Sequence, residues 1–199
     1  MQNIIFMLIK RLFITVTLFI SISGCTPIYD WRTVRSDDLL YEALYPGKPS
    51  RAEKVMSYQG QKLTMTMEAV KVKDGLYAVG VIQVPSELRS LDSTNSLMSF
   101  VQNGMLGNLK TSEVTSPKPI KIKTYQGELL LASEWVIDGV GPDQQRRLMR
   151  LRLLQRTFPD GLVQIYQQSI LHTLKNDQSI EKILNSDEHN MFLTGFKPY

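Results

Sequence analysis

Residues 61–84 read QKLTMTMEAVKVKDGLYAVGVIQV and carry the strongest fold signal in this sequence. Residues 63–69 alternate apolar and polar side chains, which is the period of a half-buried strand. Lys73-Asp74-Gly75 has turn chemistry, and residues 76–84 are almost all apolar, as in a strand covered on both faces. Together with residues 53–58 upstream, this stretch predicts a meander of three antiparallel strands.

One helix separates this meander from a second run of strands. Residues 93–96 (STNS) supply helix-capping side chains, and the helix that follows places Leu97, Phe100, Val101 and Met105 on one face. We then expect four strands and two short C-terminal helices, at residues 120–125, 128–138, 147–158 and 162–171, and near 180–184 and 188–193. This order predicts an α+β fold, an antiparallel β-sheet of about six or seven strands with helices packed on it.

The composition is that of a folded protein with few sites for metal or disulfide chemistry. The chain has 199 residues, of which 43% are hydrophobic and 21% charged, far from the range of disordered chains. A single cysteine excludes an internal disulfide framework and any multi-cysteine zinc or iron–sulfur site. With only two histidines, a three-histidine metal site is excluded as well.

The first 25 residues, MQNIIFMLIKRLFITVTLFISISGC, have the layout of a secretory signal peptide. Lys10 and Arg11 precede an apolar or hydroxyl-bearing run at 12–22. As a helix this run is about 16 Å long, too short for a bilayer core of about 30 Å. The pattern therefore favours a cleaved signal over a permanent membrane span, and Met7 is an alternative start.

The signal ends in Ile22-Ser23-Gly24-Cys25, which resembles the lipobox of bacterial lipoproteins. The resemblance implies cleavage before Cys25, a diacylglycerol on its thiol and an acyl chain on the new amine. Two or more chains give a stable membrane anchor. The alternative is a conventional signal followed by a free thiol, a liability in an oxidising compartment. We therefore expect a signal peptide at 1–24, a lipidated tether at 25–37 and one α+β domain at 38–199.

The residue after the cysteine and the remaining charge bear on location and partners. Thr26 stands where Gram-negative lipoproteins retained at the inner membrane commonly have Asp, so the resemblance favours the outer membrane, facing the periplasm. Loss of Lys10 and Arg11 leaves 21 basic residues against 19 acidic ones, from a formal net charge of +4 in the whole chain. So small an excess argues against a nucleic-acid partner.

Two further motifs resemble the Mog1/PsbP-like fold. One is Tyr45-Pro46-Gly47-Lys48-Pro49, followed by Gly60 and Tyr77-Ala78-Val79-Gly80. The other is Phe192-Leu193-Thr194-Gly195-Phe196-Lys197-Pro198, in which Gly195 stands where the pattern usually has Ser. The resemblance covers residues 38–198 and implies an antiparallel sheet between helices. Members include photosystem accessory subunits, binding factors for small GTPases and envelope lipoproteins, and most bind other macromolecules.

The sequence contains no recognisable catalytic motif. The only cysteine is the lipid site, and neither a Gly-x-Ser-x-Gly elbow nor a phosphate-binding loop occurs. His172 and His189 have no matching acid or nucleophile motif, so we interpret each as structural or solvated. We expect a protein that is not an enzyme, with no metal and no cofactor beyond the lipid on Cys25. Dispersed catalytic carboxylates are a weaker alternative.

Basic side chains share a strand face in residues 147–156, RLMRLRLLQR. Arg150, Arg152 and Arg156 have one parity, and the intervening apolar side chains point the other way. Lys121 and Lys123 alternate with apolar residues in the same manner. If the two strands lie in register, these five cations form a face for phosphate head groups or an acidic partner. The alternative is a solvated face whose cations are paired with carboxylates.

Two hypotheses for function follow. The first is a lipid-anchored envelope protein whose non-catalytic domain binds an unknown envelope protein, in assembly or maintenance. The second is a carrier or sensor of a small amphiphile or anionic lipid, held between the sheet and a helix. A cavity lined by Met65, Met67, Phe100 and Met105 would favour the second, and a filled core the first.

Overall fold

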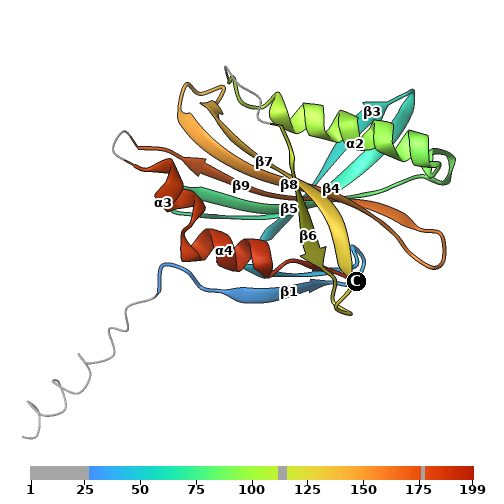
Figure 1. The fold of residues 1–199 in the computed structure, drawn as a ribbon, viewed down its shortest axis with the longest axis horizontal. Helices are drawn as coiled ribbons and strands as arrows, with labels where there is room; N and C mark the ends of the chain where they lie inside the picture. The colour runs from blue at the N-terminus through green and yellow to red at the C-terminus, as the bar shows by residue number, and fades with distance from the viewer. Residues whose placement is uncertain (1–26, 112–115, 176–177) are drawn as a thin grey trace, which may run out of the picture.

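A computed structural model describes residues 27–111, 116–175 and 178–199 (Figure 1). The predicted signal peptide, the lipobox residues Ile22, Ser23 and Gly24, and the lipidation site Cys25 lie outside the described residues. Among the helices that the structure describes, none has the length and apolar character needed to cross a membrane.

The centre of the fold is a seven-stranded antiparallel sheet in the order β3-β4-β5-β9-β8-β7-β6. Its strands are β3 (Ser50–Tyr58), β4 (Gln61–Val72), β5 (Gly75–Gln83), β6 (Lys118–Lys123), β7 (Leu129–Val140), β8 (Arg146–Thr157) and β9 (Val163–Thr173). The predicted α+β architecture is confirmed, including the β3-β4-β5 meander and the four later strands β6 to β9. The buried strand β5 joins the two halves by pairing with β9, from Gly75 opposite His172 to Gln83 opposite Gln164.

A second, three-stranded sheet was not predicted. It has the order β1-β2-β10 and consists of β1 (Arg32–Ser36), β2 (Tyr41–Tyr45) and β10 (Lys197–Pro198). The sequence assigned residues 32–36 to the tether because their polarity has no sustained period. They are nevertheless a strand, because β2 offers a complete pairing edge and because Trp31 and Val34 pack against the core beneath.

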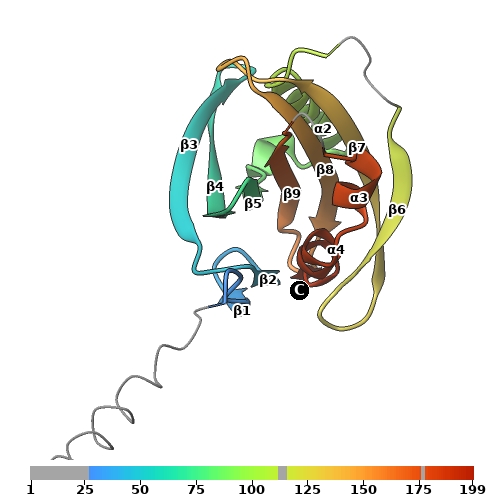
Figure 2. The ribbon, with the colours of Figure 1, turned by 90° about the vertical axis from the view of Figure 1, so that its left-hand side faces the viewer.

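The two faces of the large sheet are covered by different elements (Figures 1 and 2). On one face lies α2 (Leu91–Leu106), which follows the short 3-10 helix η1 (Ser86–Leu88). The helix begins slightly before the predicted capping segment, since Ser90 Oγ accepts a hydrogen bond from the Ser93 backbone N–H at 3.2 Å. Leu97 and Val101 are its buried contacts with the sheet.

The other face carries α3 (Ile180–Leu184), α4 (Asp187–Thr194) and the small sheet. Its core is aromatic, and the rings of Tyr41 and Phe196 lie 5.6 Å apart, those of Tyr45 and Phe192 5.5 Å apart. The Tyr41 hydroxyl donates to the buried carboxylate of Glu68 at 2.5 Å, so even the polar end of this ring is satisfied. The small sheet and α4 are therefore held to the large sheet by ring packing.

Gly195, the departure from the resembled motif, is explained by a close approach of β2. A Cβ atom at this position would overlap Leu44 Cβ and lie 2.8 Å from the Met191 carbonyl oxygen. A serine there has no space, because the obstacle includes backbone as well as side chain.

We therefore expect Gly195→Ser to lower the free energy of unfolding by about 1–3 kcal/mol, the usual range for overpacking. Chemical unfolding followed by circular dichroism measures this loss. Gly104→Ser is the matched control, because an added Cβ at Gly104 meets no atom within 4 Å. Equal stability of the two variants would contradict the close approach.

Candidate functional site

A cavity of about 500 Å³ lies between α2 and the large sheet. Its wall is mainly apolar and unusually rich in thioethers. The methionines that line it are Met56, Met65 and Met67 from β3 and β4, Met105 from α2 and Met149 from β8. The volume is within the range of about 300–1,000 Å³ that small-molecule sites occupy. Methionine side chains are flexible and polarizable, so such a wall adapts to ligands of varied shape.

The cavity exists because the side chains of the sheet beneath one side of α2 are small. Ala78 and Ser169, which face α2 from β5 and β9, are small. Gly80 is smaller still, and a Cβ there would approach the Met65 sulfur at 3.3 Å. On the β7–β8 side, by contrast, the large side chains of Trp135 and Leu151 are buried in the same cluster as Leu97 and Val101 of α2. The methionines border the remaining space without filling it.

All four residues named in the amphiphile hypothesis line this cavity. Met65 and Met67 form part of its floor, and Phe100 and Met105 come from α2. Phe100 is partly exposed and packs on Tyr58, with 5.0 Å between ring centres. The sequence thus identified the helix and strand faces that meet here, although it could not show that they leave a space between them.

The charged groups that line the cavity are both cations. They are Lys54 on β3 and Arg147 on β8, and among the described residues no carboxylate lines the cavity. Arg147 Nη2 forms an ion pair with Asp143 in the β7–β8 turn, and its side chain is 21% exposed. Its Nε is buried and has no hydrogen-bond partner in the part of the chain that the structure describes. An anion in the cavity would meet no like charge on its wall.

A buried amide adds a polar point to the floor. Gln167 is fully buried and its Nε2 donates to Ser169 Oγ at 3.3 Å. Its Oε1 has no partner among the described atoms. A buried carbonyl oxygen without a donor is costly, so this oxygen is suited to accept from a ligand or a water molecule in the cavity.

Sequence reasoning missed these polar residues, although two signals were present. Arg147 has the parity of Met149 and Leu151, so a cation stood on a face otherwise apolar. Gln167 and Ser169 likewise interrupt the apolar positions of β9 that face α2. In a strand that is covered by a helix, a polar residue at a position where the alternation predicts an apolar one indicates that the helix does not pack closely there. These positions were therefore the available sequence signal for a cavity.

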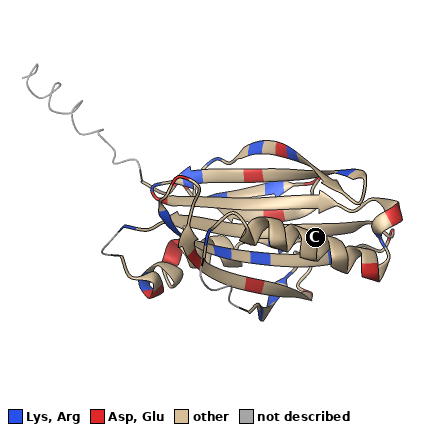
Figure 3. Cartoon of the chain, turned by 90° about the horizontal axis from the view of Figure 1, so that it is seen from above, with Lys and Arg blue, Asp and Glu red and all other residues tan. Residues whose placement is uncertain are grey.

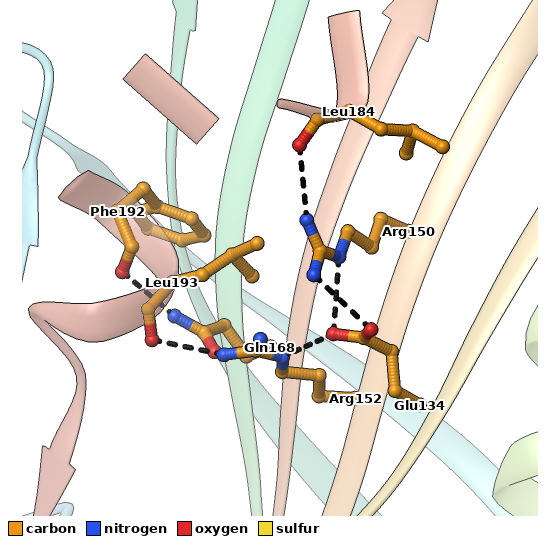
Figure 4. Close-up of polar contacts among 7 residues, drawn as sticks. All are labelled: Glu134, Arg150, Arg152, Gln168, Leu184, Phe192 and Leu193. Atoms are coloured by element: carbon orange, nitrogen blue, oxygen red, sulfur yellow. Dashed lines mark hydrogen bonds and ion pairs between the residues drawn. The ribbon is translucent and has the colours of Figure 1, made fainter. Parts of the chain in front are cut away.

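The predicted basic face has a different environment in each of its parts. Arg150 and Arg152 come together over Glu134 on β7 (Figure 4). The Glu134 carboxylate accepts from Arg150 Nε at 3.0 Å and Nη2 at 3.1 Å, and from Arg152 Nε at 2.6 Å. Each arginine also donates to a helix C-terminal carbonyl, Arg150 to Leu184 at 3.2 Å and Arg152 to Leu193 at 3.0 Å. We call these three charged residues the arginine clamp.

The arginine clamp is buried, and its electrostatics reflect that. Burial on its own would raise the pKa of Glu134, but the hydrogen bonds from Arg150 and Arg152 outweigh it and hold the pKa below its usual value. Burial also lowers the pKa of Arg152 despite the attraction of Glu134. The clamp remains charged, and its favourable contacts are offset by the desolvation of both partners. Its clearest effect is to fix the ends of α3 and α4 on the sheet.

The remaining predicted cations do not join that group. Arg156 pairs with Glu128 at 2.8 Å and lies over the ring of Phe158. Lys121 is opposite Leu131 on β7 and Lys123 opposite Leu129, a parity that places both lysines on the α2 side of the sheet. Figure 3 shows Lys and Arg interspersed with Asp and Glu along the strands. Anion binding by any of these five residues remains a prediction.

The two histidines meet in a second hollow beside α4. Their ring centres are 5.7 Å apart, and none of the four ring nitrogens has a hydrogen-bond partner in the described segments. His189 is 2% exposed and lies edge-on to Tyr77. Burial, reinforced by His172 and Arg150, lowers the pKa of His189 to about 4. In the described segments, no cluster of three or more His, Cys, Asp or Glu residues could hold a metal ion.

No protein-family model matches the chain, and no curated protein matches it.

For the arginine clamp we expect Glu134→Ala to lower the free energy of unfolding by about 3–5 kcal/mol, because it leaves two buried guanidinium groups without a counter-charge. Urea unfolding measures the change. The triple variant Glu134→Leu/Arg150→Met/Arg152→Met removes all three charges and should lose much less. If Glu134→Ala is as stable as the wild type, the arginine clamp does not support the fold.

Because His189 is buried in its neutral form, we expect the free energy of unfolding to decrease as the pH is lowered. The unfolded histidine takes up a proton near pH 6.5, whereas the folded one resists it until about pH 4. Stability is therefore complete above pH 6.5 and declines by up to about 3 kcal/mol as the pH falls towards 4. Urea midpoints at pH 7.5 and 4.5 measure the decline, which His189→Phe should reduce. An identical decline in the variant would assign it to other groups.

Proposed function

We propose that this chain is a lipid-anchored protein of the bacterial cell envelope whose folded domain binds a small amphiphile in the cavity under α2. The observation that carries the proposal is the cavity itself, with its methionine wall and its few polar groups. Small-molecule sites are typically concave, mostly apolar and supplied with a small number of placed polar groups. The four residues that distinguish the two sequence-based hypotheses all line it, and this favours the amphiphile over the protein partner.

The lipobox-like segment supports the location in the envelope. In this proposal residues 1–24 are removed and Cys25 carries diacylglycerol and an N-acyl chain, at the outer membrane and facing the periplasm. Tyr29 already contacts the domain, since Lys73 Nζ lies 5.3 Å from the centre of its ring. Four residues of extended chain span at most about 14 Å. The anchored domain would thus stay beside the bilayer, where sparingly soluble amphiphiles are concentrated.

A second candidate function is binding of an envelope protein, and one surface favours it. Leu129 and Leu131 on β7 are 59% and 75% exposed, and they share a sheet face with the exposed Lys123 and Lys121 opposite them. Exposed apolar side chains rimmed by charge are common at protein interfaces. This surface lies near the edge strand β6, away from the lining of the cavity, so the two functions would be separable by mutation.

The test of the proposal blocks the cavity from α2. Gly104 is exposed and lines the cavity, and an added Cβ there meets no atom within 4 Å. We expect Gly104→Phe to fill this space and to reduce, several-fold, labelling of the full chain in phospholipid nanodiscs by a diazirine-bearing fatty acid. The adducts are to be mapped by peptide mass spectrometry, and the loss should fall on peptides that contain Met65, Met67 and Met105.

Gly104→Ala is the matched control. It should label like the wild type and should be more stable by about 0.5–1 kcal/mol, because alanine replaces glycine within a helix. Adducts at Leu129 and Leu131 report contact with the membrane or probe in general and should not change. Undiminished labelling of the methionine peptides in Gly104→Phe, with the fold intact, would overturn binding in the cavity.

A further inference from the structure

We infer that the ligand of the α2 cavity is a single-chain anionic amphiphile whose head group binds Arg147, at the end of the cavity nearest the lipid anchor. This inference rests on the proposed function, and it adds the charge of the ligand, its orientation and the residue that recognises it.

The charge of the ligand follows from the wall. The charged lining groups, Arg147 and Lys54, are both cations, and in the described part of the chain no carboxylate lines the cavity. The rest of the wall is apolar apart from a few neutral groups. A cationic ligand would therefore meet like charges on the wall and no lining carboxylate, whereas an anion would gain charge-assisted hydrogen bonds.

Arg147 is better placed than Lys54 to hold the head group. Lys54 is exposed, so its charge is screened by water, whereas the Arg147 side chain is only 21% exposed and its Nε has no partner in the described segments. A side chain at Gly141 would lie 3.0 Å from Arg147 Nη1, so the absence of one lets the guanidinium rest against the turn. Asp143 pairs with Nη2 and orients the group.

The position of Arg147 relative to the anchor fixes the orientation. Arg147 is opposite Thr173 in the sheet, and the Thr173 backbone N–H donates to the Asp74 carbonyl at 2.8 Å. The adjacent Lys73 is the residue that contacts Tyr29 of the N-terminal segment. Arg147 and the point at which that segment contacts the domain are therefore at the same end of the sheet. In the proposed anchored protein, a head group at Arg147 would be the part of the ligand closest to the bilayer.

The size of the cavity fits one chain. From Thr173 to Gln167 along β9 is about 20 Å, at about 3.4 Å per residue. A volume of about 500 Å³ holds about 17 groups the size of a water molecule, each taking about 30 Å³. That is the size of one long acyl chain and about half of what a diacyl phospholipid requires. The chain would pass over Met149, Leu171 and Ala78 towards Gln167.

The experiment compares an acid with its neutral analogue. The full chain in phospholipid nanodiscs is photolabelled with a diazirine fatty acid or with the corresponding fatty alcohol, and unlabelled palmitate is titrated as competitor. Arg147→Met should weaken the apparent affinity for the acid about tenfold, the size of one charge-assisted hydrogen bond, and leave alcohol labelling unchanged. Asp143→Asn keeps the cation and removes the negative charge beside it, so the affinity of this variant for the acid should be unchanged or higher. Lys54→Met should change it less than twofold.

The outcomes separate this inference from the proposed function. Labelling of the cavity by acid and alcohol alike, with no effect of Arg147→Met, would overturn the anionic ligand and leave amphiphile binding standing. A loss of affinity for the acid in Lys54→Met, without such a loss in Arg147→Met, would overturn the proposed orientation of the ligand. Absence of cavity adducts from both probes would overturn the proposed function itself. Thermal melting of each variant establishes that a decrease in labelling is not caused by unfolding.

Discussion

The width of the sheet relative to the helix that covers it is the constraint on which the rest of this fold depends. Seven strands at about 4.8 Å spacing are about 30 Å across, and a helix with its side chains is only about 10 Å wide. A single helix therefore cannot cover either face. On one face the protein adds α3, α4 and a three-stranded sheet to complete the cover. On the other face α2 lies alone, and the uncovered part of the sheet becomes the wall of a cavity.

The two faces accordingly have different mechanical character. The face under α4 is fixed by interlocking tyrosine and phenylalanine rings and by the arginine clamp, whose hydrogen bonds are directional and end on particular carbonyl oxygens. The face under α2 is bordered by methionines, whose side chains have three rotatable bonds and a polarizable thioether. Rigidity on one side and adaptability on the other suit a domain that keeps its shape while its cavity adjusts to what it holds.

Much of the fold follows from local pattern, and the site does not. The alternation at 63–69 and the turn at Lys73-Asp74-Gly75 predicted the first meander, since hairpin pairing needs only neighbouring residues. The pairing of β5 with β9, which sets Gly75 opposite His172, has no such local signal, because the two strands are far apart in the sequence. The small sheet was missed because Lys197 and Pro198 are too short a strand to show a period. Parity placed Arg150 and Arg152 on one face, but their shared carboxylate Glu134 comes from another strand.

The small sheet also bears on the order of events during folding. β2 pairs with β1 on one side and with β10 on the other, so a strand close to one end of the domain is joined to the last strand at the other. The aromatic core beneath includes Phe192 and Phe196 and cannot close until those residues are available. A chain that emerges amino end first, from a ribosome or a translocation channel, thus keeps this face open until nearly all of it has passed. Premature folding is delayed by topology alone, which is a useful property in any protein that must be threaded before it takes its final shape.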